Sequence, residues 1–310
     1  STAIQELAFT FSNAITYVEY AIKAGLNIDD FAGQLSFFFV AQNNLFEEIA
    51  KFRAARRIWA NIMKNRFNAK NPRSCMLRFH TQTAGVTLTA QQTDNNIIRT
   101  TVQALGAILG GTQSLHVNSK DEALGLPTEE SAQISLRTQQ ILAYESGISE
   151  TVDPLAGSYY IEELTNQLEN SAMEYINKID DLGGALKALD KNFQINEIHN
   201  NAFKLQNEIE NDQRIVVGVN KFQSENFKID KIQSIDPLET KKQLSRLNET
   251  KNRRSNQDVK ESLKTLKVIA TTKENIFPQI LKCVECYATL GEISNVLREV
   301  FGEYVQLNSL

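Results

Sequence analysis

His80 and Gln82 are the residues of this sequence best suited, by type and position, to chemistry. They follow residues 75–79, an apolar run typical of a buried strand, and open a run of hydrogen-bonding side chains. In parallel α/β proteins the carboxyl ends of strands carry the active site, because the loops there vary while strands and helices hold position. An imidazole and an amide placed there could orient a substrate carbonyl or phosphate by hydrogen bonds. The alternative is that His80 is an ordinary buried histidine with satisfied hydrogen bonds.

His116, Asn118 and Glu122 form a second candidate group around a shorter apolar run, residues 114–117. The same two interpretations, a hydrogen-bonding site or a satisfied buried group, apply to it. No third ligand stands at a recognised metal-binding spacing, so we expect no metal site.

Three other motifs are predicted to be structural. Cys283 and Cys286 have redox or half-zinc spacing but no second pair, so they are predicted to lie on one turn of a buried helix. Gly110 and Gly111 end a helix instead of opening one, so they do not form a phosphate-binding loop. The four cations of residues 51–57 are predicted to form a solvated helix face, with an anionic ligand or a partner surface as the alternative.

The elements that position these residues are predicted to form three strand–helix units. Strands are predicted at residues 35–40, 75–79 and 114–117, the first so continuously apolar that both its faces should be covered. Helices are predicted at residues 4–24, 45–67 and 95–109, with a further one starting at Pro127. The larger apolar side chains of helix 95–109 are predicted to face the core. Units about 40 residues apart favour a parallel sheet with right-handed crossovers.

The predicted fold class is therefore α/β, either an open sheet or the later part of a (β/α)8 barrel. Residues 1–158 would form the partial barrel, and residues 159–310 a mainly helical extension and linker wrapping it. Within this extension, residues 215–220 are predicted to form a short buried strand or an extended segment, residues 224–236 a polar linker, and Thr289 to Glu292 a capping box.

Charge and cysteine content exclude several classes of protein. The net charge of −4, from 33 basic and 37 acidic residues, gives no field that would favour nucleic acid or an anionic membrane as partner. Three cysteines are too few and too unevenly placed for a disulfide framework, and no secretory signal or membrane-length apolar run is present. The expected location is the cytoplasm.

Several long blocks of the sequence resemble the large subunit of methylmalonyl-CoA mutase and its acyl-CoA mutase relatives. They run over nearly the whole chain: EEIAKFRAARRIWA (47–60), NPRSCMLRFHTQTAG (71–85), LTAQQTDNNIIRT (88–100), GGTQSLHVNSKDEALGLPTEES (110–131), DPLAGSYY (153–160), VVGVNKFQ (216–223) and ATLGEISNVLREVFGEY (288–304). The resemblance implies an adenosylcobalamin-dependent enzyme whose (β/α)8 barrel surrounds the tail of an acyl-CoA substrate. In such enzymes the adenosyl radical takes a substrate hydrogen, and a carbonyl-CoA group migrates to the neighbouring carbon.

The resemblance also implies roles for residues at matched positions. His80 and Gln82 match the histidine and glutamine that face the reacting acyl group and the corrin, so catalytic roles are expected for both and a cofactor contact for Gln82. Asn118 and Glu122 match residues that hydrogen-bond the adenosyl group or its surroundings.

Four further positions match the part of the family site that holds the substrate. Ser36 and Phe38 match residues lining the acyl-CoA channel, and Arg73 matches a basic residue near the CoA. At Gln34 many members have an arginine beside the CoA tail, so this contact is weakened here from a charge-assisted hydrogen bond to a neutral one.

Two departures from the family pattern concern regions outside the matched blocks. Members begin well before the position of Ser1, with the first barrel strands and a tyrosine, an arginine and a histidine that grip the acyl group. The Asp-x-His-x-x-Gly motif of the cobalamin-binding domain is also missing. We therefore expect the chain to be inactive alone and to act, in a hetero- or homo-oligomer, with the missing amino-terminal barrel half and a cobalamin-binding domain or small subunit.

The expected function is that of an isomerase subunit converting (R)-methylmalonyl-CoA to succinyl-CoA by radical rearrangement. The alternatives are a related mutase acting on isobutyryl-CoA or 2-hydroxyisobutyryl-CoA, and a non-catalytic subunit that keeps the fold to assemble with an active partner. Retention of the matched polar residues at positions 80, 82, 118 and 122 favours an enzyme, whereas the absent half and Gln34 favour a structural subunit.

Overall fold

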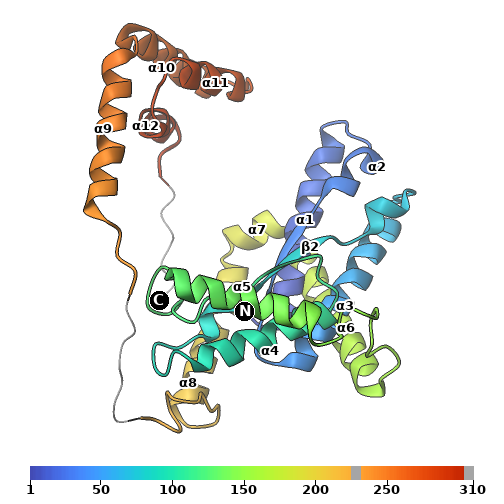
Figure 1. The fold of residues 1–310 in the computed structure, drawn as a ribbon. Helices are drawn as coiled ribbons and strands as arrows, with labels where there is room; N and C mark the ends of the chain where they lie inside the picture. Colours follow the sequence, from blue (N-terminus) through green and yellow to red (C-terminus); the bar gives the residue numbers. More distant parts are fainter. Residues whose placement is uncertain (225–231, 304–310) are drawn as a thin grey trace. The chain divides into compact units, whose positions relative to one another are not determined.

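The computed structural model describes residues 1–224 and 232–303 (Figure 1). The chain divides into two compact units, Ser1–Gln233 and Ser234–Leu310. Residues 225–231 of the predicted linker and Tyr304 of the last matched block lie outside the described residues. The assignment of residues 1–158 to a barrel domain and 159–310 to an extension around it stays a prediction.

The first unit contains a parallel sheet of three strands, as predicted. The strands are β1 (Phe37–Ala41), β2 (Phe79–Thr83) and β3 (Ser114–His116), in the order β1-β2-β3. Phe38 pairs with His80 and Val40 with Gln82 across β1 and β2, while His80 and Gln82 pair with Ser114 and His116 of β3.

The helices of the first unit follow the predicted order. The predicted ones are α1 (Ala3–Lys23), α3 (Leu45–Asn61), α4 (Asn95–Leu109) and α5 (Glu129–Tyr144), and α3 continues as the π-helical turn η2 (Ile62–Arg66). Thr2 caps α1 in a capping box with Gln5, and Thr128 caps α5 through the backbone N–H of Ser131. The remaining elements are α2 (Ile28–Phe31), η1 (Ala32–Gln34), η3 (Pro72–Cys75), η4 (Gly85–Thr87), α6 (Tyr159–Asp181), α7 (Ala185–Asp190) and α8 (Phe193–Glu210).

The second strand begins four residues later than predicted. Residues 72–75 form the 3-10 turn η3, and the run from His80 to Thr83, predicted as a loop, is the strand itself. Its side chains alternate, with Phe79, Thr81 and Thr83 buried and His80 and Gln82 half-buried. The buried hydroxyls have partners, because Thr81 Oγ1 donates to Thr112 Oγ1 and Thr83 Oγ1 accepts from the Asn118 N–H. A threonine-rich strand with satisfied hydroxyls therefore replaces the expected loop.

The main core lies against one face of this sheet. Helices α1, α3 and α6 pack together there (Figure 1), and rings from the helices and the sheet are in contact, among them Phe11, Phe39, Phe52, Trp59 and Phe79. The opposite face is open within the described residues, since Phe38 is 54% exposed. The prediction that both faces of β1 are covered is therefore not met by this part of the protein.

Helix α4 meets the core only partly through the predicted side: Leu105 and Ile108 pack against the cluster of Ala104, Val117 and Leu142, but the fully buried positions are smaller or polar. Ile98 is 64% exposed, whereas Gln103, Ala104 and Ala107 are buried. Helix α4 packs on α3, and only small side chains fit between them: a Cβ added at Gly110 would lie 2.5 Å from the Phe52 ring. Close helix approach overrides the apolar pattern here.

The cations of α3 are not a solvated face, so that prediction was wrong. Arg53 pairs with Asp153 and with Glu162 (2.6 Å), which ties α3 to the loop before α6 and to α6 itself. Arg57 bonds Asn166 and Glu169 of α6, and Arg56 donates to the Gly110 carbonyl (2.5 Å). The fourth cation, Lys51, is fully buried.

The second unit is helical, with α9 (Pro237–Arg253), α10 (Asn256–Ala270), α11 (Phe277–Glu285) and α12 (Leu290–Phe301). Its core contains Leu266, Cys283 and Ile293. Cys283 is buried on α11, 3.1 Å from Ser262 Oγ, whereas Cys286 is half-buried and follows the last residue of the helix, Glu285. Both are free thiols, and the prediction of a buried helical position is confirmed for Cys283. In the first unit, the segment predicted to be extended at residues 215–220 forms only an isolated bridge, between Val217 and Lys221.

The predicted capping box is confirmed at the start of α12, and it makes the second unit sensitive to acid. Thr289 and Glu292 cap each other, and Arg254 donates to both Glu292 oxygens (2.6 and 2.8 Å). The hydrogen bonds from Arg254 lower the pKa of Glu292 from 4.5 to about 2. A carboxylate with a lowered pKa stabilises the fold above its ordinary pKa, and this stabilisation is lost as the pH falls from 4.5 towards 2.

We therefore expect Glu292→Gln to reduce the loss of stability of the second unit between pH 4.5 and 2. The measurement is hydrogen exchange of the α12 amides across this range. Glu299→Gln is the control, because the Glu299 pair with Lys267 is exposed and should contribute little. Equal acid sensitivity of the wild type and Glu292→Gln would contradict the assignment.

None of the helices in the described ranges is long and apolar enough to cross a bilayer.

Candidate active site

The open face of the sheet brings the predicted site residues together. Because side chains alternate along a strand, Phe38 and Val40 of β1 share this face with His80 and Gln82 of β2. Ser114 and His116 of β3 continue the same two rows. The result is a mostly polar surface on the side of the sheet opposite the aromatic core, with the imidazole of His80 and the primary amide of Gln82 at its centre. We call this surface the polar face.

His80 is held from both sides on this face. Its Nδ1 lies 2.7 Å from Ser114 Oγ on β3, and its ring centroid lies 5.0 Å from that of Phe38 on β1, with the planes tilted by 49°. A ring with one nitrogen engaged and one face against an aromatic side chain has a restricted orientation. His80 can therefore direct its second ring nitrogen at a bound ligand.

Gln82 is oriented by Asn118. Gln82 Nε2 donates to Asn118 Oδ1 (2.7 Å), and Asn118 Nδ2 donates in turn to the Thr83 carbonyl (2.9 Å). Asn118 is only 1% exposed, so its amide acts within the protein. This arrangement leaves Gln82 Oε1 as an acceptor at the carboxyl end of the polar face.

Glu122 and Gly85 lie beside Asn118 at the same end of the sheet. A Cβ added at Gly85 would lie 3.0 Å from Asn118 Nδ2 and 3.4 Å from Glu122 Oε1. The Gly85 backbone therefore lies against both side chains, and the lack of a side chain is what lets Asn118 and Glu122 approach it this closely. The structure thus places Asn118 next to both Gln82 and Glu122.

Gln34 and Arg73 lie at the amino end of the sheet, where η1 packs against η3. Both side chains are exposed, and a Cβ added at Gly33 would lie 3.7 Å from Arg73 Cβ. Asp29 anchors the loop that carries Arg73: it accepts from Ser74 Oγ (2.8 Å) and from two backbone N–H groups of residues 70 and 71. These hydrogen bonds, led by that of the residue 70 N–H, lower the pKa of Asp29.

Ser36 and Phe38 line a pocket of about 240 Å³ between α1 and β1. Its other lining residues are Thr10, Asn13, Ala14, Tyr17, Leu35 and Phe37. Ser36 and Phe38, which were predicted to line the acyl-CoA channel, therefore border an open space.

Sequence reasoning missed two residues of the polar face, Arg78 and Ser114. Arg78 precedes His80 by two residues, so the period of the strand was the signal that could have found it. Ser114 lies beside His80 because of the register in which β2 pairs with β3. This register could not be predicted from the sequence.

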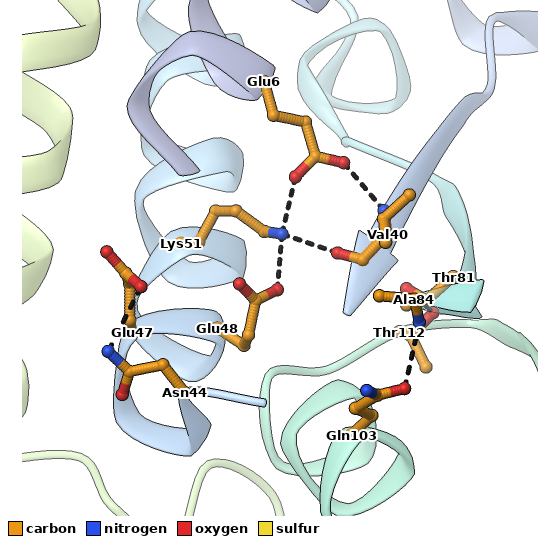
Figure 2. A network of polar contacts seen from close by, with 10 residues as sticks. All are labelled: Glu6, Val40, Asn44, Glu47, Glu48, Lys51, Thr81, Ala84, Gln103 and Thr112. Carbon is orange, nitrogen blue, oxygen red and sulfur yellow. Dashed lines mark hydrogen bonds and ion pairs between the residues drawn. The ribbon is translucent and has the colours of Figure 1, made fainter. Parts of the chain in front are cut away.

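Gln103 was also missed, and it ties together the carboxyl ends of β1 and β2. Its Oε1 accepts from the Ala84 N–H (3.0 Å), and its Nε2 donates to Asn43 Oδ1 (2.5 Å) and Thr87 Oγ1 (2.6 Å). Figure 2 shows the contact with Ala84. Gln103 is fully buried on α4, but nothing in the sequence distinguishes it from a glutamine on the surface.

No group of three or more histidine, cysteine, aspartate or glutamate side chains within residues 1–224 and 232–303 is arranged to hold a metal ion.

Comparison with known proteins agrees with the resemblance. A family model described as methylmalonyl-CoA mutase matches residues 1–303. The chain is 44% identical over 309 residues to methylmalonyl-CoA mutase of Rhizobium meliloti, covering 99% of this chain and 43% of that protein. It is 42% identical over 307 residues to the 2-hydroxyisobutanoyl-CoA mutase large subunit of Aquincola tertiaricarbonis, covering 98% of this chain and 54% of that subunit.

Methylmalonyl-CoA mutase of Escherichia coli is 42% identical over 306 residues, which are 98% of this chain and 43% of the relative. The chain thus spans about half the length of the curated relatives it matches. With the family model matching almost every residue, the chain belongs to the methylmalonyl-CoA mutase family.

Proposed function

We propose that this chain is the later part of the substrate-binding (β/α)8 barrel of an adenosylcobalamin-dependent acyl-CoA mutase. The observation that carries the proposal is the polar sheet face, on which His80 is held by Ser114 and Gln82 by Asn118. Its three parallel strands would be part of the barrel wall, with residues 1–158 in the barrel and 159–310 around it. The polar face would then line the interior, which suits a barrel that admits a polar ligand.

The acyl-CoA would lie along this face, from the amino end to the rim. Arg73 at the amino end suits a phosphate of the CoA, and neutral Gln34 would add a weaker hydrogen bond. Ser36 and Phe38 would border the chain of the substrate. His80 would then be placed to hydrogen-bond the acyl carbonyl and to stabilise charge that develops on its oxygen.

The carboxyl rim fits the adenosyl part of the cofactor. Asn118 and Glu122 lie together against Gly85 at this end, and a carboxylate suits the hydroxyl groups of a ribose. When bound, adenosylcobalamin supplies the radical that starts the rearrangement. Gln82, Asn118 and Glu122 would position the adenosyl group, while a cobalamin-binding domain or small subunit would hold most of the cofactor.

A non-catalytic subunit is the second candidate. It is favoured by the exposed, neutral Gln34 at a position where an arginine would bind the CoA more strongly. Such a subunit would keep the fold and assemble with an active partner, and its polar face would have no turnover to support.

The test is turnover by the complete protein, assembled from this chain, the remaining barrel strands and the cobalamin-binding domain or subunit. With (R)-methylmalonyl-CoA and adenosylcobalamin we expect succinyl-CoA, and none when the cofactor is omitted. Isobutyryl-CoA and 2-hydroxyisobutyryl-CoA are assayed in parallel, because one of the matched relatives is a 2-hydroxyisobutanoyl-CoA mutase subunit. If the assembled complex turns over none of the three acyl-CoA substrates, the proposal of an enzyme is wrong and that of a non-catalytic subunit is favoured.

A further inference from the structure

Residues 214–224, which follow α8, form a turn that is organised around the side chain of Asn220. Asn220 Oδ1 accepts from the Val216 N–H (2.7 Å). Asn220 Nδ2 donates to the carbonyls of Ile209 (2.9 Å) and Arg214 (2.8 Å). These three hydrogen bonds give the segment a defined shape, and we call it the 214–224 turn.

The 214–224 turn lies against Gln92, a residue of the loop that precedes α4. Gln92 Nε2 donates to the Phe222 carbonyl (2.9 Å) and to Ser224 Oγ (2.8 Å). A Cβ added at Gly218 would lie only 2.9 Å from Gln92 Cδ, and Gly218 has a φ of +83°. Both the backbone conformation and the close approach therefore require glycine at this position.

A second contact of the 214–224 turn leads through α4 to residues 118–125, which we call the rim loop. Arg99 Nη2 donates to the Val217 carbonyl (2.7 Å), and Arg99 Nη1 donates to Asn96 Oδ1 (2.8 Å). Asn96 is fully buried, and its Nδ2 donates to the Lys120 carbonyl (2.8 Å). Successive hydrogen bonds thus join the turn to the rim loop.

The rim loop carries Asn118 and Glu122, the two residues of this loop that were proposed to position the adenosyl group. Lys120 lies between them in the sequence, so a fixed Lys120 backbone limits how far either side chain can move. Beyond Glu122, a Cβ added at Gly125 would lie 3.4 Å from Ile232 Cγ2. Residues that follow α8 therefore reach the rim loop before Glu122 through α4 and after it directly.

We propose that the 214–224 turn braces the rim loop in the conformation that binds the adenosyl group, with Gln92, Arg99 and Asn96 as positioning residues. The inference deepens the proposed function, because it rests on the assignment of the rim loop to that group. The brace would restrict Glu122 before the ligand binds, and this reduces the entropy that binding costs. Loss of the brace should therefore weaken binding of the cofactor.

The first test is amide hydrogen exchange of the rim loop in the complete protein without cofactor. The N–H groups of Glu122, Leu124 and Gly125 are hydrogen-bonded within this loop, so their exchange reports its opening. In Gly218→Ala the added methyl group would push the turn away from Gln92. We expect the three amides to exchange faster than in the wild type, by about 3-fold or more.

Gly157→Ala is the matched control for Gly218→Ala. Gly157 has a φ of +81°, close to that of Gly218, but a Cβ added at Gly157 would meet no atom within 4 Å. Both variants therefore introduce similar backbone strain, and only Gly218→Ala disturbs the contact with Gln92. Gln92→Ala removes the same contact from the other side and should reproduce the faster exchange.

The second test is binding of adenosylcobalamin to the complete protein, followed by visible absorption. Gly218→Ala and Gln92→Ala should raise the Kd by about 3- to 10-fold, whereas Gly157→Ala should match the wild type. KM for the acyl-CoA should stay unchanged in all three variants, because the residues proposed to bind it belong to η1, η3, β1 and β2 and to the start of β1. A general loss of stability would not separate Kd from KM in this way.

Unchanged exchange of the rim loop in both Gly218→Ala and Gln92→Ala would show that the turn does not brace it, and would overturn the proposal. Faster exchange with an unchanged Kd would show that the brace does not serve the adenosyl site, and would overturn that role. The exchange experiment needs neither cofactor nor turnover. A complete protein that binds no adenosylcobalamin would therefore refute the proposed function and the adenosyl role with it, while exchange would still decide whether the turn holds the rim loop.

Discussion

Replacing Lys51 with methionine is expected to lower the free energy of unfolding of the first unit by about 3–5 kcal/mol. The ammonium of Lys51 is completely buried and contacts the carboxylates of Glu6 and Glu48 and the carbonyl of Val40 (Figure 2). Glu48 is only 1% exposed, and this burial raises the pKa of its carboxyl group. Without the cation, two carboxylates and one carbonyl would lose their common partner in that environment.

The measurement is urea unfolding of the wild type and the variant under the same conditions. Lys64→Met, an exposed lysine in the helical turn that continues α3, is the control and should change stability by less than about 0.5 kcal/mol. The triple variant Glu6→Gln, Glu48→Met and Lys51→Met should recover part of the loss, because it leaves no buried charge unpaired. A Lys51→Met protein as stable as Lys64→Met would show that the cluster is neither buried nor coupled.

The same lysine shows where prediction from the sequence stops. Helical periodicity located α3 correctly, but a run of four cations within seven residues was taken for a solvated face. Lys51 forms an ion pair with Glu6, which lies 45 residues earlier in the sequence. Arg53 forms one with Glu162, which lies more than 100 residues later. Ion pairs between distant elements leave no local pattern, so the partner of a charge cannot be recognised before the fold is known.

The strands show a second reason why the sequence predicted only part of the structure. β1 was found to within two residues because it is apolar throughout, whereas β2 was displaced because its threonines look like a loop. Thr81 and Thr83 can be buried only because Thr112 and Asn118 satisfy their hydroxyls from other segments. His80 and Gln82 were therefore singled out at a supposed strand end, although they lie within the strand on its open face.

From the sequence, the polar face could be predicted only for residues of the same strand. Alternation alone joins His80 to Gln82, but the partners that orient them, Ser114 and Asn118, depend on the pairing of β2 with β3. Residue type and the resemblance both singled out Asn118 and Glu122, but neither pointed to Ser114.

His80→Ala in the complete protein is expected to lower kcat by about 10- to 1000-fold, because a hydrogen bond to developing charge on the acyl group would be lost. Phe38 and Ser114 would remain to line the face, so KM for the acyl-CoA should change far less than kcat. His199→Ala is the control, since His199 is exposed on α8, and its kinetics should match the wild type.

Ser114→Ala separates the orientation of His80 from its presence. This variant keeps the imidazole but removes the hydroxyl that lies 2.7 Å from Nδ1, so kcat should fall in the same direction as in His80→Ala and by a smaller factor. If the serine orients the ring, adding Ser114→Ala to His80→Ala should lower kcat no further, because the ring it acts on is already gone. Unchanged kcat in His80→Ala would remove the imidazole from the mechanism and leave Gln82, held by Asn118, as the polar group of the sheet face nearest the rim.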